Sequence, residues 1–174
     1  MNQTLIAVPV PAAEPLIRGI VEKYHAAFPS ARPDDLLAHI TVLGPFVPIE
    51  ACNDQLFGKL RTVFSQTKRF DFRLGEVATF PGDVVYLAPE PADAFVELTR
   101  VAVEAFPGCP PYGGRFQSVI PHLTVGPIWS VEMERDLIAR ARNVAPIDAA
   151  ARCVSLIHNR DDAFETIATF PFAE

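Results

Sequence analysis

The 174-residue chain has few cysteines, a deficit of positive charge and no long apolar run. Its three cysteines, Cys52, Cys109 and Cys153, are widely spaced and form no CxxC pair. This pattern argues against a disulfide framework and predicts reduced, mostly buried thiols in a cytoplasmic protein. A catalytic thiol is the alternative reading of the cysteines.

The shortage of basic residues constrains the partner. The chain has 15 Lys and Arg residues against 21 Asp and Glu residues, which gives a net charge of −6. A protein that grips a long nucleic acid neutralises many phosphates with basic side chains. The composition therefore favours an RNA end or a small nucleotide as substrate, although a local basic cluster is compatible with it.

No segment has the composition of a membrane span. The longest stretch without charge, residues 116–131, is 16 residues long and contains two prolines and a histidine. A spanning helix needs roughly 20 apolar residues. The N-terminus has no basic residue before Arg18, so a targeting segment is not expected either. Apolar residues make up 49% of the chain, which suits one compact domain, expected to be a monomer without a membrane partner.

Two parts of the chain repeat one pattern. Residues 4–29 and 84–107 each contain a β-branched apolar run, a proline-bounded break and a helical pattern that ends in Phe-Pro. The sequences AHITVLGPF and PHLTVGPIW follow, and both carry His-x-Thr-Val and then Gly-Pro. The Phe-Pro pairs lie 78 residues apart and the motif histidines 83 residues apart. These similar offsets favour a tandem duplication over chance similarity and predict one domain built from repeats at about 1–81 and 82–174.

The periodicity of apolar residues predicts the fold class. Helical spacing recurs after each motif, at 49–64 and 131–142. Including the earlier segments, about four helices and about eight strands are expected, with loops at 30–37 and 108–118. The predicted fold is α+β, a bilobal pseudo-two-fold duplication with two mainly antiparallel sheets, helices on the outer faces and a central cleft. Strand-like runs close the two units at 70–80, 149–158 and 164–172.

Each motif places a histidine and a threonine on one face of a predicted strand. Because residues i and i+2 share a face, His39 points with Thr41, and His122 points with Thr124. One imidazole can take a proton from attacking water while the other gives a proton to the leaving oxygen. The threonine hydroxyls can donate to non-bridging phosphate oxygens. The pattern predicts phosphodiester hydrolysis in the cleft, with the histidines catalytic and the threonines binding the phosphate.

A zinc site and a structural role are the alternative uses of these histidines. Zinc needs three or four ligands, but each motif histidine shares its predicted face only with a threonine. A lone strand histidine is usually structural, whereas recurrence in two matching positions favours function. A reaction without metal or cofactor is therefore expected. His25 and His158 have no threonine two residues on and are predicted to be structural.

The two motifs resemble the signature motifs of the 2H phosphoesterase superfamily. More narrowly, the stretches TFPGDVVYLAPEP, PPYGGRF and VIPHLTVG look like its 2′-5′ RNA ligase-like branch, and the likeness covers nearly the whole chain. The resemblance implies a bilobal fold whose cleft holds both motifs. It also implies 2′,3′-cyclic phosphodiesterase or reversible 2′-5′ RNA ligase activity. When the motifs are matched position by position, the family's functional residues correspond to His39, Thr41, His122 and Thr124.

Three further residues are secondary candidates for substrate binding. Tyr112 and Arg115 lie in the glycine-rich loop before the second motif, and the guanidinium of Arg115 suits a phosphate. A plain solvent-exposed arginine is the alternative there. Phe46 follows the first motif and could stack on a base, although burial in the core is favoured.

Three functions remain open at the level of sequence. The first is an enzyme that opens 2′,3′-cyclic phosphates at RNA ends. The second is a phosphodiesterase for a small metabolite, such as a cyclic phosphate of ADP-ribose, which the acidic charge favours slightly. The third is a non-catalytic nucleotide-binding module, against which the two intact motifs argue.

Overall fold

The computed structural model describes residues 3–32, 35–116, 118–160 and 163–174. Within them the chain forms eight strands and four α-helices, in agreement with the sequence-based expectation. The strands are β1 (Gln3–Pro9), β2 (His39–Leu43), β3 (Phe70–Phe80), β4 (Val84–Glu90), β5 (Leu123–Pro127), β6 (Ile147–Ala151), β7 (Cys153–Arg160) and β8 (Ala163–Pro171). The α-helices are α1 (Glu14–Lys23), α2 (Asp54–Phe64), α3 (Asp93–Ala105) and α4 (Val131–Val144).

The two helices that follow the motifs begin at polar caps. The Asn53 side chain accepts a hydrogen bond of 3.0 Å from the Leu56 amide, and Ser130 accepts one of 3.1 Å from Met133. Such caps satisfy backbone amides that the first helical turn leaves unpaired. All four α-helices bury one face against the core. In α3, for example, this face consists of Phe95, Leu98, Thr99 and Ala102.

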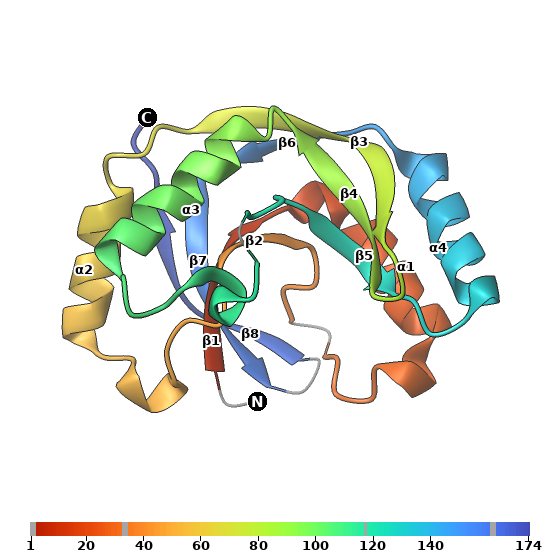
Figure 1. The fold of residues 1–174 in the computed structure, drawn as a ribbon, viewed down its shortest axis with the longest axis horizontal. Coiled ribbons are helices and arrows are strands. Elements are labelled where there is room, and N and C mark those ends of the chain that lie inside the picture. The colour runs from red at the N-terminus through yellow and green to blue at the C-terminus, as the bar shows by residue number, and fades with distance from the viewer. Residues whose placement is uncertain (1–2, 33–34, 117, 161–162) are drawn as a thin grey trace.

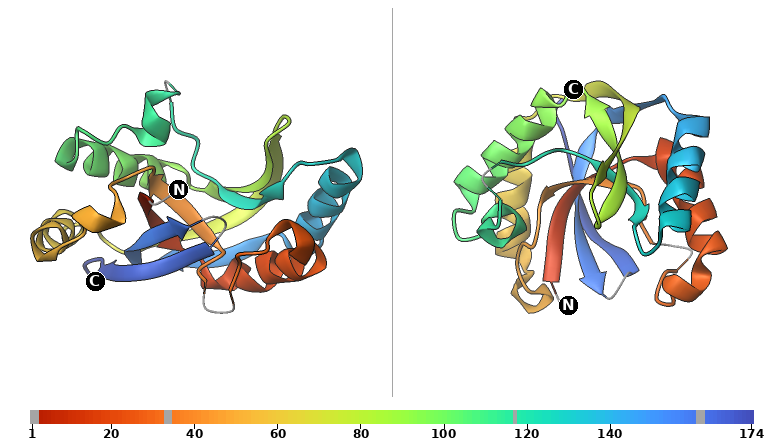
Figure 2. Two further views of the ribbon diagram at one scale, coloured as in Figure 1. Left: turned by 90° about the horizontal axis from the view of Figure 1, so that it is seen from below. Right: turned by 45° about the vertical axis from the view of Figure 1, so that its right-hand side comes forward.

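The strands form one strongly curled sheet, in which every described pairing between named strands is antiparallel (Figure 2). The strand order is β6-β3-β4-β5-β2-β1-β7-β8. Helices α1 and α4 pack near β4 and β5, while α2 and α3 pack near β2 and β8. Figure 1 shows these helix pairs on the two outer sides of the molecule, with the strands between them.

The two halves of the chain exchange strands within this sheet. From the first half, β3 pairs with β4, the first strand of the second half. From the second half, β7 returns to pair with β1 at the start of the chain. Each half of the sheet is therefore built from both halves of the sequence.

The two halves of the sheet meet where β2 pairs with β5. The register places Ile40 opposite Leu123, and both side chains are fully buried. The neighbouring apolar residues of the two strands, Val42 and Val125, are buried as well. The apolar face of each motif thus packs in the core, as strand alternation predicts.

Three details differ from the expectation. The two predicted sheets are joined into one at β2 and β5, because each strand edge needs a hydrogen-bonding partner and these two edges meet. The predicted strand 149–158 is interrupted at Arg152 and divides into β6 and β7. The predicted loop 108–118 contains a tight turn at Pro111–Gly114, in which Tyr112 and Gly113 have left-handed backbone angles (φ 51° and 64°).

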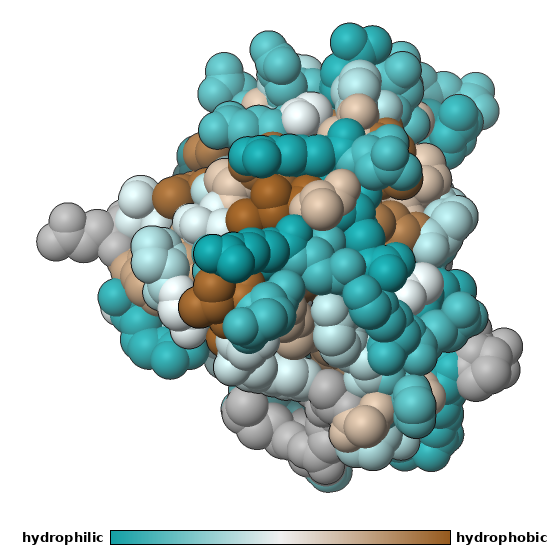
Figure 3. Space-filling view, turned by 90° about the vertical axis from the view of Figure 1, so that its right-hand side faces the viewer, coloured by the Kyte–Doolittle hydropathy of each residue, from teal (hydrophilic) through white to brown (hydrophobic). Residues whose placement is uncertain are grey.

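The side that carries α1 and α4 is mainly polar. Figure 3 shows hydrophilic side chains over most of this side, with apolar ones gathered in a band across its middle. Such a division is usual for amphipathic helices on a core. Among the described helices, none is both long and apolar enough to cross a membrane.

Candidate active site

The structure brings the two His-x-Thr motifs together at the junction of β2 and β5. Because Ile40 and Leu123 face the core as an antiparallel pair, the residues on either side of them face the other way. Continuing this register by one residue places His39 beside Thr124 and Thr41 beside His122. The four polar side chains therefore share one face of one sheet, on adjoining strands.

Two further observations agree with this placement. His39 and Thr124 line the same cavity, which has a volume of about 280 Å³. In addition, His122 contributes to lowering the pKa of His39, as expected for two imidazoles that lie close together. The predicted pairs are thus neighbours across a strand junction within one sheet, whereas the sequence predicted two sheets with both motifs in the cleft.

His39 is half-buried and fixed by a backbone carbonyl. Its Nδ1 lies 3.3 Å from the Leu36 oxygen, and its ring centroid lies 5.1 Å from that of Phe164. Because a carbonyl only accepts, Nδ1 carries the proton and Nε2 is the nitrogen that can take one. Burial lowers the pKa of His39 to about 4, an effect that the Leu36 carbonyl partly opposes. The ring is therefore neutral at pH 7.

His122 has a matching arrangement. Its Nδ1 lies 2.8 Å from the Ile120 oxygen, so Nε2 is again the nitrogen available for proton transfer. Burial lowers the pKa of His122, whereas the Ile120 carbonyl and the Asp83 carboxylate favour the charged form and oppose that shift. The His122 environment thus contains an anionic neighbour that favours its protonation.

Two aromatic rings beside His122 were not identified from the sequence. Phe80 and Tyr86 stack on each other with centroids 4.4 Å apart, and both meet the His122 ring edge to face, at 5.1 and 5.4 Å. The β4–β5 pairing places Tyr86 there, because Tyr86 lies opposite Thr124, and Phe80, at the end of β3, stacks on Tyr86. The alternation of β4 indicates which face of the strand Tyr86 lies on. Only the register between β4 and β5 shows that this face is the one that carries Thr124.

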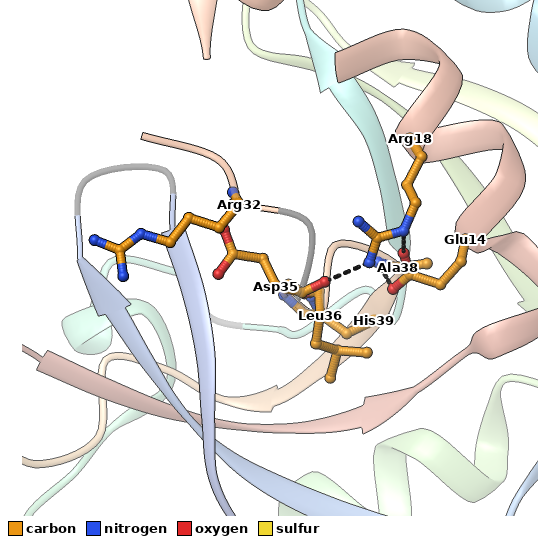
Figure 4. Close-up of polar contacts among 7 residues, drawn as sticks. All are labelled: Glu14, Arg18, Arg32, Asp35, Leu36, Ala38 and His39. Carbon is orange, nitrogen blue, oxygen red and sulfur yellow. Dashed lines mark hydrogen bonds and ion pairs between the residues drawn. The ribbon is translucent and has the colours of Figure 1, made fainter. Parts of the chain in front are cut away.

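Contacts from α1 hold the segment that carries the Leu36 carbonyl (Figure 4). Arg18 donates a hydrogen bond of 2.7 Å to the Asp35 carbonyl, and Glu14 accepts one of 2.9 Å from the Ala38 amide. Glu14 and Arg18 also form an ion pair, with 3.1 Å between Oε2 and Nε. The two ends of the segment before His39 are therefore tied to one helix.

The secondary candidates have different surroundings. Tyr112 is half-buried, and its amide donates a 2.7 Å hydrogen bond to the Gly44 carbonyl beside the first motif. Arg115 is exposed, and its Nε donates back to the Tyr112 carbonyl at 3.2 Å. Phe46 is buried and packs edge to face on Phe106, with centroids 4.9 Å apart. This placement favours the core role for Phe46 over base stacking.

The remaining histidines and the cysteines lie outside this junction. His25 is exposed in a short 3₁₀ helix, and His158 is buried on β7. All three cysteines are half-buried rather than buried, and burial raises the pKa of each thiol, which disfavours the reactive thiolate. Among the described residues, no group of three or more His, Cys, Asp or Glu side chains could hold a metal ion.

Comparison with known proteins agrees with this architecture. Solved structures with the same fold include one described as a phosphoesterase (15% identity, TM-score 0.58, 99% of both chains covered). A protein of Thermus thermophilus is 18% identical, with a TM-score of 0.59 over 97% of both chains. Escherichia coli LigT complexed with 3′-AMP is 14% identical, with a TM-score of 0.57 over 99% of both chains.

At these identities the structural likeness concerns the fold. No curated protein sequence matches the chain. The family model of the 2′-5′ RNA ligase superfamily, however, matches residues 8–163, which include both motifs and the whole of strands β2 to β7. The chain therefore belongs to the 2′-5′ RNA ligase superfamily.

Proposed function

We propose that the protein is a metal-independent phosphodiesterase that opens 2′,3′-cyclic phosphates of nucleotides or RNA ends. The observation that carries this proposal is the placement of His39, Thr41, His122 and Thr124 on one face at the junction of β2 and β5. Two proton-transfer groups and two hydroxyl donors on one face of adjoining strands are the groups that phosphodiester hydrolysis needs. Membership of a superfamily of phosphoesterases and ligases supports the same reaction class.

The two histidines have different roles in this proposal. His39 is the general base, because its pKa of about 4 keeps Nε2 unprotonated at working pH. His122 is the general acid: burial lowers its pKa, but the Ile120 carbonyl and the Asp83 carboxylate oppose that shift, whereas the pKa of His39 falls to about 4. A bound phosphodiester anion beside the two rings would raise both pKa values.

The proposed reaction transfers two protons and replaces one oxygen bonded to phosphorus by another. His39 takes a proton from water while the water oxygen bonds to phosphorus. The bond between phosphorus and one ribose oxygen breaks, and that oxygen receives the proton of His122. Thr41 and Thr124 donate hydrogen bonds to the non-bridging oxygens, where negative charge gathers in the transition state. A 5′-hydroxyl of a second RNA in place of water would give ligation by the same route.

The pH dependence of kcat/KM is expected to be bell-shaped with an acidic optimum. The base must be unprotonated, so activity should fall as the pH drops through about 4, the pKa of His39. The acid must be protonated, so activity should also fall as the pH rises through the pKa of His122, which burial places below 6.5. Steady-state rates between about pH 3 and 9 report these values for the free enzyme.

The profile of kcat should be shifted to higher pH than that of kcat/KM, because the bound anion favours both protonated rings. A single limb in kcat/KM, or an optimum above about pH 8, would contradict the assignment of base and acid.

The direct test of the function is turnover of a nucleoside 2′,3′-cyclic phosphate with and without EDTA. Activity is expected to be unchanged by the chelator, because the proposed steps use only imidazole and hydroxyl groups. The enzyme should first be dialysed against EDTA, and Mg²⁺, Mn²⁺ or Zn²⁺ should then be added back. Loss of activity that a divalent ion restores would overturn the mechanism.

The net charge of −6 favours a small cyclic nucleotide over a long RNA as the substrate. Competition between a cyclic mononucleotide and an RNA that ends in a 2′,3′-cyclic phosphate distinguishes the two. A non-catalytic nucleotide-binding module would show binding of the mononucleotide without turnover.

A further inference from the structure

An apolar cavity of about 280 Å³ opens beside the proposed catalytic residues. His39 and Thr124 form part of its lining. Most of the remaining lining consists of aliphatic and aromatic side chains from α1, the segment after it, β5 and the start of β8. A group that fills this cavity therefore lies next to His39, the general base of the proposed mechanism.

Aromatic rings stand at several points of the cavity wall. Phe164 lies next to His39, with ring centroids 5.1 Å apart. Phe28 and Trp129 form a tilted pair with centroids 5.6 Å apart. Trp129 is 58% exposed, so part of its ring is accessible to a ligand.

The segment on one side of the cavity is held in place before any ligand binds. Leu37, which lines the cavity, lies between the Asp35 carbonyl and the Ala38 amide. Arg18 and Glu14 of α1 bind these two groups (Figure 4). A ligand would therefore meet a wall that is already ordered, which reduces the entropy lost on binding.

We propose that this cavity binds the nucleobase of the substrate, a nucleoside 2′,3′-cyclic phosphate. This inference rests on the proposed function, because the cyclic phosphate must lie between His39 and His122. The cyclic phosphate is fused to the ribose that carries the base, so a base within reach of His39 can enter the adjoining cavity. The flat rings of Phe28, Trp129 and Phe164 offer surfaces on which bases stack.

The chemistry of the lining favours a nucleobase over a second phosphate. The described residues that line the cavity include no Lys, Arg, Asp or Glu. A phosphate would need cationic or amide donors, whereas a base gains from apolar and aromatic contact. The volume lies slightly below the range of about 300–1,000 Å³ for pockets that hold an entire ligand, which suits one group of a nucleotide.

The test compares two substrates that differ only in the base. Adenosine 2′,3′-cyclic phosphate and methyl β-D-ribofuranoside 2,3-cyclic phosphate carry the same reacting group. We expect Trp129→Ala to lower kcat/KM for the adenosine compound about 10-fold and to leave that for the methyl ribofuranoside within about 2-fold. Phe28→Leu keeps apolar volume but removes a flat ring, and should act in the same direction.

Phe116→Ala is the matched control, because Phe116 is 63% exposed but lies on the loop that contains Tyr112. It should change neither substrate's kcat/KM. If Phe116→Ala lowered only the adenosine value while Trp129→Ala had no effect, the base would bind at that loop and the inference would be overturned. Equal losses on both substrates in Trp129→Ala would also overturn it. If the unaltered protein turned over neither substrate, the proposed function itself would fail.

Discussion

Alanine in place of His39 or His122 is expected to lower kcat on a 2′,3′-cyclic phosphate at least about 10²-fold. Each change removes one of two proton-transfer groups, and such a group contributes about 10²–10⁴-fold to the rate. The double variant should be little slower than either single variant, since the two rings act on one transition state and their effects do not add. Thr41→Ala and Thr124→Ala should cost less, about 10–10²-fold, because one neutral donor is lost while the others remain.

Asparagine variants supply the matched control for the histidines. The amide nitrogen of Asn is placed like Nδ1 of His, so His39→Asn can still donate to Leu36 and His122→Asn to Ile120. Neither variant has a group that replaces Nε2. Steady-state kinetics and thermal melts on all variants should therefore show lost activity with nearly unchanged stability. If a folded His39→Asn or His122→Asn protein kept near-full activity, the paired acid–base mechanism would have to be abandoned.

A substrate with a good leaving group is expected to restore most of the rate lost in His122→Ala and none of the rate lost in His39→Ala. The general acid protonates a poor leaving group, a ribose oxygen, as its bond to phosphorus breaks. A nitrophenolate leaves without that proton, so removal of the acid should cost little on a nitrophenyl phosphodiester. The base is still needed to activate water on both substrates.

The experiment measures kcat/KM of both variants on the cyclic phosphate and on the nitrophenyl ester of a 2′-deoxynucleoside 3′-phosphate, which has no 2′-hydroxyl to displace nitrophenolate in place of water. The loss in His122→Ala should shrink from at least about 10²-fold to less than about 10-fold on the ester. Rescue of His39→Ala with no rescue of His122→Ala would exchange the two roles. Rescue of neither would show that the rings act through something other than the proposed proton transfers.

Strand alternation explains why so much of the site could be predicted from the sequence. In each motif the histidine and threonine are two residues apart, and local geometry alone puts them on one face while Ile40 and Leu123 enter the core. The helices were predictable because the helical spacing of apolar residues is also a local signal.

The parts that could not be predicted depend on which distant strands pair. The motifs gave no register between β2 and β5, so the joined sheet and the His39–Thr124 neighbours appear only in three dimensions. The carbonyls of Leu36 and Ile120 set the tautomers of the two histidines. Their directions depend on the backbone conformation, which the sequence alone does not reveal. Burial of Phe46 was expected, but the sequence did not identify its packing partner Phe106, which lies 60 positions later in the chain.

The pairing of β7 with β1 has a consequence for synthesis of the chain on the ribosome. Strand β1 is made first, but one of its two neighbours begins at Cys153 and is made near the end. Both motifs are complete before that strand is made, so the nascent chain carries every proposed catalytic residue while one half of its sheet still lacks β7 and β8. Such long-range pairing is slow to form and exposes unpaired edges. A message truncated before β7 would therefore yield a product with both motifs intact and no stable place to hold them.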